Sequence, residues 1–210
     1  MEDAAYAAAG RRKMRNKQRK KGWRNMKRIC ACLLALLALT VGVALAEDMA
    51  VYQSEHGYTL ALPDASWFRL DGDTYQQYSS MHAEFAAQGV EDADEAAAYA
   101  GKGLECYFSP DAPGAVFVVQ RQEVTISDSD LELTLSGLRQ LYEALMGAEG
   151  YTDGAFTFGE TLYEGCAYTL EGVYTTQLYV RPHDGLSYIL TSKGIDEETL
   201  EAMLAASTFA

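Results

Sequence analysis

The chain has 210 residues, and its 17 Lys and Arg against 30 Asp and Glu give a formal net charge of −13. The charge is divided unevenly, because 11 of the basic residues lie between Arg11 and Arg28, whereas residues 47–210 hold six basic and 28 acidic side chains, a net −22. So acidic a body excludes nucleic acid as a partner, since phosphate binding needs Lys and Arg on the docking face. An apolar fraction of 49% excludes a disordered acidic chain.

An apolar run of 18 residues, 29–46, follows the basic block without a charge. It ends in Ala44-Leu45-Ala46, with small residues at the two positions that a signal peptidase reads, and Glu47 follows. These parts are typical of a secretory signal peptide cleaved after Ala46. The alternative is an uncleaved single-pass anchor, because a bilayer span needs about 17–25 apolar residues. In both cases the basic flank stays in the cytoplasm and the acidic body is exported, secreted or held in the cell envelope.

The basic lead before this run is long for a signal peptide. A chain that begins at Met26 starts Met-Lys-Arg and has an ordinary signal, so residues 1–25 are either an over-extended start or a basic tail. Cys30 and Cys32 open the apolar run, whereas a lipid-anchored cysteine must lie at the cleavage point. We therefore interpret both as small apolar side chains.

Residues 47–210 have the size of one compact domain and contain no Ser/Gly/Pro linker and no repeat. In the first half, Tyr75, Tyr78, Met81 and Phe85 fall at helical spacing, whereas the flanking segments alternate like strands. The predicted elements are, in order, a hairpin (50–55 and 58–62, turning at His56-Gly57), a short strand (67–70), a helix (74–88), a short helix (91–100) and two strands (104–109 and 115–124).

The second half begins with a helix that a capping box at Ser129-x-x-Glu132 introduces and Gly147 ends. Glu-Gly and Asp-Gly pairs then separate strand-length runs, as in a meander with tight turns. The predicted strands are 156–163, 166–170, 174–181 and 186–192, with turns at 164–165, 171–172 and 184–185, and a last helix over 197–209 is capped by Asp196. The sequence therefore predicts an α+β domain, a central antiparallel sheet with two or three helices packed on it.

This order of elements, with "YTLALPDASWFRLDG" in the hairpin region and "LEAMLAASTFA" at the end, is similar to the PsbP-like family, which includes the extrinsic photosystem subunit P and small exported bacterial proteins. The similarity covers most of residues 50–210, and the Ala-rich stretch at 91–100 resembles an insertion. The resemblance implies a non-enzymatic binding or assembly domain. It transfers no binding residue, because no functional motif matches.

Motifs for catalysis are not found in the sequence. His56, His82 and His183 are not spaced as zinc ligands, and neither a G-x-S-x-G elbow nor a glycine-rich phosphate loop occurs. We therefore predict no catalytic residues, no metal site and no cofactor. The alternative is an extracytoplasmic hydrolase, because Ser-His-Asp arrangements are recognised by geometry alone.

Three residues are candidates for ligand binding. Asp71 and Asp73 in D-G-D-T offer oxygens for calcium, although acids before a helix also serve as caps. Tyr179 points away from its apolar neighbours on the strand and is the surface candidate, whereas Tyr168 and Tyr188 share faces with apolar residues and are expected in the core.

Cys106 and Cys166 are the cysteines that remain after cleavage. An oxidising compartment favours one disulfide between them, and two buried free thiols are the alternative.

The predicted function is that of an exported, non-catalytic binding domain with an unknown protein or cell-envelope partner. The charge favours a cationic or aromatic-complementary partner, although acidity also serves to keep an exported protein soluble. Association with a membrane is expected only through residues 29–46, if they are not cleaved from the chain.

Overall fold

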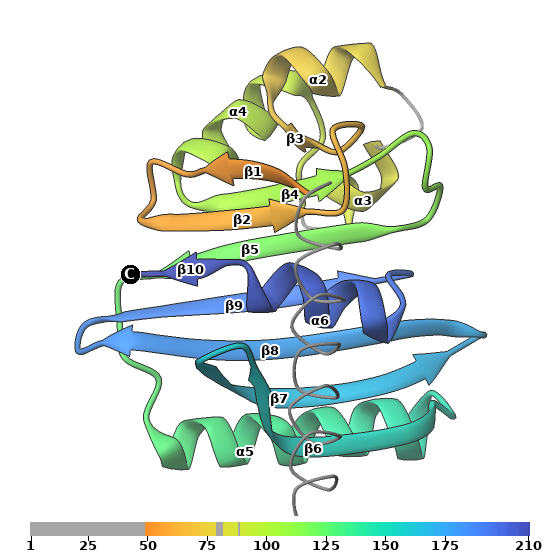
Figure 1. Ribbon diagram of the computed structural model, residues 1–210. Helices are drawn as coiled ribbons and strands as arrows, with labels where there is room; N and C mark the ends of the chain where they lie inside the picture. Colours follow the sequence, from red (N-terminus) through yellow and green to blue (C-terminus); the bar gives the residue numbers. More distant parts are fainter. Residues whose placement is uncertain (1–48, 79–81, 88) are drawn as a thin grey trace, which may run out of the picture. The chain divides into compact units, whose positions relative to one another are not determined.

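The computed structural model describes residues 49–78, 82–87 and 89–210, so the predicted signal segment lies outside the described residues. The described part is α+β, with two antiparallel sheets and helices (Figure 1). The large sheet has the order β3-β4-β5-β9-β8-β7-β6 and consists of β3 (Phe68–Leu70), β4 (Leu104–Phe108), β5 (Val116–Gln122), β6 (Glu149–Phe158), β7 (Thr161–Leu170), β8 (Val173–His183) and β9 (Leu186–Lys193). The small sheet has the order β1-β2-β10 and consists of β1 (Ala50–Gln53), β2 (Tyr58–Leu62) and β10 (Thr208–Phe209).

The helices are α2 (Gly72–Gln77), α3 (His82–Ala86), α4 (Ala93–Gly101), α5 (Asp128–Arg139), which continues as the π-helix η2 (Gln140–Leu145), and α6 (Glu197–Ala205). None of the helices in the described part of the chain has the length and apolar character needed to cross a bilayer. The α+β class agrees with the sequence, but two or three helices was too low a number, since the described residues form five α-helices.

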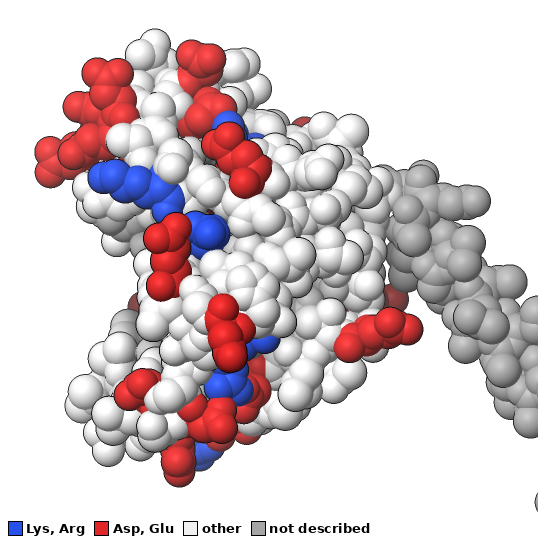
Figure 2. Space-filling view, turned by 90° about the vertical axis from the view of Figure 1, so that its left-hand side faces the viewer, with Lys and Arg blue, Asp and Glu red and all other residues white. Residues whose placement is uncertain are grey.

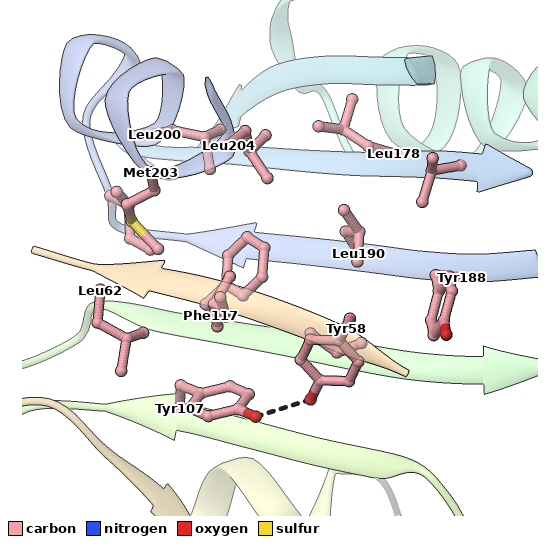
Figure 3. Close-up of a cluster of buried hydrophobic side chains, with 14 of the residues drawn as sticks. Tyr58, Leu62, Tyr107, Phe117, Leu178, Tyr188, Leu190, Leu200, Met203 and Leu204 are labelled. Carbon is pink, nitrogen blue, oxygen red and sulfur yellow. Dashed lines mark hydrogen bonds between the residues drawn. The ribbon is translucent and has the colours of Figure 1, made fainter. Parts of the chain in front are cut away.

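One face of the large sheet is covered by the small sheet and α6. Side chains that alternate along the strands place Tyr107, Phe117 and Leu190 on this face. Figure 3 shows them meeting β2 and α6 in one apolar cluster, whose helix side chains are Leu200, Met203 and Leu204. All six are buried at 1% exposure or less, so this contact forms the main core.

The opposite face carries two separate groups of helices. At one end α2, α3 and α4 pack on β3, β4 and β5 around Phe85 and Phe108. At the other end α5 and η2 pack around Cys166 and Tyr168 of β7. Between them, side chains such as Val118 and Thr191 on the central strands are half-buried.

The helix that the sequence predicts over 74–88 is divided into α2 and α3. α2 begins earlier because Asp71 caps it: Asp71 Oδ1 accepts from the backbone N–H groups of Asp73 and Thr74, both at 3.1 Å. Thr74 Oγ1 in turn accepts from the Asp71 N–H at 2.7 Å and completes the capping box. The helix ends at Gln77, five residues before α3 begins.

The cap of α5 also differs from the prediction. Ser127, not Ser129, caps the helix, because Ser127 Oγ accepts from the Asp130 N–H at 3.2 Å. The same hydroxyl donates to the Asp130 carboxylate at 2.5 Å. Two serines at spacing two both satisfy the sequence pattern, and the structure uses the first.

The predicted meander is present, but its first turn was misplaced. Gly165 lies inside β7 and pairs with Leu178 of β8, where a Cβ would clash with the carbonyl oxygen of Gln177. The turn is at Gly159, which has a φ of +60° and joins β6 to β7. The glycine at 165 therefore allows two strands to approach closely, and the one at 159 makes the turn.

The last helix ends at Ala205 and not near Phe209. Ser207 Oγ donates to the Met203 carbonyl oxygen at 2.6 Å and accepts from the Ala61 N–H at 3.0 Å. This pair of bonds turns the chain, so that the final residues pair with β2 as β10.

Of the two alternatives for Cys106 and Cys166, the structure contains the buried free thiols. They lie on one cross-strand row, in which Val118, Thr191 and Gln177 stand between them. Four strand spacings separate the two residues by about 19 Å, far beyond the limit of about 7 Å between the Cα atoms of a disulfide. Alternation along a strand indicates which of its sides is apolar, but it does not give the order of the strands in the sheet.

We expect both thiols to be protected in the folded protein and free after unfolding. Burial raises the pKa of the Cys106 thiol and that of the Cys166 thiol, so both stay in the unreactive thiol form. A thiol reagent should label neither residue in the native protein and both in denaturant without reductant, as read by mass spectrometry of their peptides. Absence of label in denaturant would show a bridge and contradict the strand order.

Candidate functional site

Glu105 of β4 is a charged side chain inside the core, with no exposed surface. Its carboxylate accepts hydrogen bonds from Arg69 Nη1 at 2.6 Å, Ser54 Oγ at 2.7 Å and Tyr107 OH at 3.2 Å. Tyr58 OH donates to it as well. Tyr58 OH and Tyr107 OH are also 2.7 Å apart (Figure 3), and because each phenol has one proton, Tyr107 shares its proton between Tyr58 and Glu105. We call Glu105 and these four donors the Glu105 cluster.

Strand geometry brings the cluster together. Glu105 and Tyr107 alternate onto the same face of β4, and Arg69 of β3 lies directly opposite Tyr107 in the register. Ser54 and Tyr58 come from the two arms of the β1–β2 hairpin, which packs over that face. The cluster therefore links the small sheet to the edge of the large one.

The electrostatics of the cluster hold the carboxylate ionised. Burial alone would raise the pKa of Glu105, but hydrogen bonds from Tyr58, Arg69 and Ser54 and the positive charge of Arg69 outweigh it and lower the pKa. Burial, with the charge of Glu105, raises the pKa of both Tyr58 and Tyr107, so these phenols remain neutral donors. Among the described residues no buried side-chain N or O lacks a hydrogen-bond partner. The cluster is therefore saturated and acts as a structural link.

Two of the three histidines line one depression. His56 and His183 lie with Glu55 and Arg121 around a hollow of about 380 Å³, where the β1–β2 and β8–β9 turns meet the end of β5. His56 Nε2 is 2.9 Å from the carbonyl oxygen of Ala100, and His183 Nδ1 is 3.0 Å from that of Asp184. No sequence pattern predicts this proximity, because the two residues are far apart along the chain.

His82 lies elsewhere, on α3. Its ring stacks on that of Tyr75 with centroids 3.9 Å apart, and its Nε2 is hydrogen-bonded to the Tyr75 carbonyl oxygen. Each of the three histidines thus contacts a main-chain oxygen, and the described residues show no hydrogen bond from any of these rings to a Ser, Thr or Cys side chain.

The two aspartates that the sequence offered for calcium serve α2. Asp71 is its N-cap and forms an ion pair with Arg69 at 3.5 Å. Burial of Asp71 is outweighed by its hydrogen bonds with Thr74 and by Arg69, so the pKa of Asp71 lies below its ordinary value. Asp73 is exposed in the first turn. Within the described ranges, no group of three or more His, Cys, Asp and Glu is placed to hold a metal ion.

Tyr179, the predicted surface residue, is buried at 4% exposure. Its OH accepts from Gln177 Nε2 at 2.6 Å, and burial raises the pKa of Tyr179 to about 12. Tyr179 does face away from Leu178 and Val180, as predicted, but the side of the strand on which it lies is buried as well. Tyr168 and Tyr188, expected in the core, are 5% and 0% exposed.

Helix α5 forms one wall of a second hollow, of about 310 Å³, which the sequence did not reveal. Carboxylates predominate in its lining, with one arginine; the charged residues are Asp128, Glu132, Arg139, Asp153 and Glu164. Arg139 is held by Asp153 at 2.6 Å, and Arg181 pairs with Asp128 and Glu164. Figure 2 shows Asp and Glu outnumbering Lys and Arg on the face that it displays. We call this hollow the α5 pocket.

No model of a protein family matches the chain, and no curated protein matches it. Several solved structures match the chain, among them the following three. A cyanobacterial PsbP (CyanoP) from Synechocystis sp. PCC 6803 is 10% identical with a TM-score of 0.47, and the match covers 78% of this chain and 93% of that one. A protein from Bacteroides thetaiotaomicron is 9% identical with a TM-score of 0.43, covering 75% and 47%. Protein PA94 of unknown function from Pseudomonas aeruginosa is 12% identical with a TM-score of 0.32, covering 76% and 95%. A PsbP protein is thus among the structures that match the chain.

We expect Glu105→Gln to lower the free energy of unfolding by about 3 kcal/mol, because breaking a buried pair leaves its donors without a charged acceptor. This is the lower end of the usual range, since the Arg69 side chain is 25% exposed. The matched control is Glu123→Gln, whose pair with Arg121 is exposed and should contribute at most about 1 kcal/mol. Urea unfolding at neutral pH measures both, and equal losses would contradict the structural role of the cluster.

The stability difference between the wild type and Glu105→Gln should depend on pH. The folded-state pKa of Glu105 is lowered from its ordinary 4.5, so its contribution is complete above that value and is lost as the pH falls through the folded pKa. The stability difference between the wild type and Glu105→Gln should therefore narrow as the pH falls.

Proposed function

We propose that residues 47–210 are an exported, non-catalytic binding domain that takes a cationic partner in the cell envelope. The observation that carries the proposal is the net charge of −22 over this stretch. Such a charge produces a field that attracts basic surfaces and repels anionic polymers. The predicted signal peptide supports the location outside the cytoplasm.

The arrangement of the titratable groups supports binding over catalysis. The buried carboxylate of Glu105 is surrounded by its own donors, which leaves no position for a substrate proton. His56, His82 and His183 contact main-chain oxygens. A hydrolytic triad needs instead a histidine within hydrogen-bond reach of a nucleophile.

The alternative function is that of an extracytoplasmic hydrolase. One observation favours it: His56, His183 and Arg121 line the same hollow, and they could combine a base with a stabiliser of negative charge. A second alternative is a membrane-anchored surface protein, in which residues 29–46 stay attached.

Export predicts a mature N-terminus at Glu47, because the A-x-A site precedes it. N-terminal sequencing of the protein recovered from the envelope or the medium of the producing cell measures this. Protein that still begins at or before residue 29 would support the anchored form.

Binding through charge predicts that the association rate with the partner falls steeply with salt. The screening length shrinks from about 10 Å at 0.1 M to about 3 Å at 1 M, so the attraction should act only at low salt. We expect capture of a basic protein from an envelope extract of the producing cell, with an on-rate at least tenfold lower at the higher salt. Double-stranded DNA and vesicles of anionic lipid serve as controls and should not bind.

Two outcomes would overturn this proposal. Salt-insensitive capture, or none, would leave the acidity as an aid to solubility. Turnover of an ester, glycoside or peptide substrate that His56→Gln or His183→Gln abolishes and His82→Gln does not would establish the hydrolase.

A further inference from the structure

Helix α5 and its continuation η2 carry apolar side chains on two sides. The inner side packs on the sheet through Leu131, Leu135, Leu138 and Tyr142. On the outer side Leu133, Leu141 and Leu145 are 74%, 41% and 79% exposed, and Met146 at the end is 49% exposed. These are four of the seven large apolar side chains that are exposed in the described residues. Such a concentration on one helix marks an interaction surface, whereas scattered apolar residues do not.

A glycine interrupts the outer row. Leu133, Gly137, Leu141 and Leu145 follow one another at intervals of four, so they lie along one side of the helix. A Cβ at Gly137 would meet no atom within 4 Å, and Gly137 is not among the residues with positive φ. The fold therefore needs no glycine there, although glycine weakens a helix interior relative to alanine. The gap between Leu133 and Leu141 is open to a side chain from outside.

Acidic groups lie on another side of the same helix. Asp128 and Glu132 of α5, with Asp153 and Glu164 of the strands, line the α5 pocket. Arg139 pairs with Asp153, and Arg181 pairs with Asp128 and Glu164, so these four carboxylates and two arginines together carry a net charge of −2. The exposed row thus belongs to a domain whose net charge of −22 favours Lys and Arg on a partner.

The geometry points to a docking surface for an amphipathic helix of the partner, with leucine-type side chains along one side and Lys or Arg flanking them. A row at intervals of four packs into the matching row of a second helix, and one partner side chain enters the gap at Gly137. The flanking cations meet the net negative charge of the domain. This inference rests on the proposed function, since the same acidic charge recruits the partner. Anionic lipid and a second acidic copy are disfavoured, because both would bring negative charge to the carboxylates.

The test uses the full chain and a labelled 18-residue peptide of Leu and Lys in amphipathic order. A peptide of equal composition in scrambled order and one of Leu and Glu are the controls. We expect binding of the first peptide only, measured by fluorescence anisotropy. Leu133→Ser with Leu145→Ser should weaken it at least tenfold. The matched variant, Val51→Ser with Val124→Ser, removes apolar side chains that are 69% and 53% exposed on other elements and should change affinity less than twofold.

Gly137→Gln separates docking from folding. It should raise the midpoint of thermal unfolding, because glutamine favours the helix, and weaken the peptide severalfold, because its side chain fills the gap. Unchanged or tighter binding by this variant would overturn the inference.

Other outcomes identify other occupants and overturn the inference as well. Uncharged phosphatidylcholine vesicles that bind through Leu133 and Leu145 would assign the surface to lipid, and a dimer lost in the same variant would assign it to a second copy. Binding by a chain that begins at Glu47 but not by the full chain would assign it to residues 11–28. Salt-sensitive peptide binding that none of the α5 variants changes would refute docking on this surface and leave the proposed function standing. If neither the peptide nor a basic envelope protein binds, both fail.

Discussion

A carboxylate that is charged and has no exposed surface constrains the fold around it. Placing Glu105 in the core without donors would cost several kcal/mol, so its stabilisation depends on where Arg69, Ser54, Tyr58 and Tyr107 stand. Tyr58, Arg69 and Tyr107 come from three strands of the two sheets, β2, β3 and β4, and Ser54 directly follows β1. The register between β3 and β4 and the position of the β1–β2 hairpin therefore depend on each other. A shift of one residue in β2, β3 or β4 would turn a donor to the wrong face.

This link gives the two faces of the large sheet different roles. The face that carries Glu105 is closed by the small sheet and α6, and its apolar cluster is almost free of solvent (Figure 3). The other face holds two helical groups that do not meet over the central strands, where Val118 and Thr191 are half-buried. Stability is therefore concentrated on the first face, and the second leaves helix surfaces available for contact.

The sequence predicts the kinds of elements well, because alternation and helical spacing report which face of each element is buried. It misjudges features that depend on a neighbour in space. Gly165 follows Glu164 in a pair that is typical of a turn, but it lies within β7 and allows β8 to approach closely. Tyr179 faces away from apolar neighbours, yet its face is buried too. Cys106 and Cys166 share a face but stand four strands apart. The proximity of His56 to His183, and the α5 pocket, arise from strand order, which no local pattern encodes.

The acidic charge of the domain and the exposed leucines of α5 are compatible with each other. A row of exposed leucines on a neutral domain would favour self-association, since apolar patches seek each other in water. Here two copies would each bring a net −22 to the contact. A basic partner would meet the opposite field and gain both the electrostatic attraction and the apolar contact. The acidity that discourages a second copy would therefore select the kind of partner that we propose for the outer face of α5.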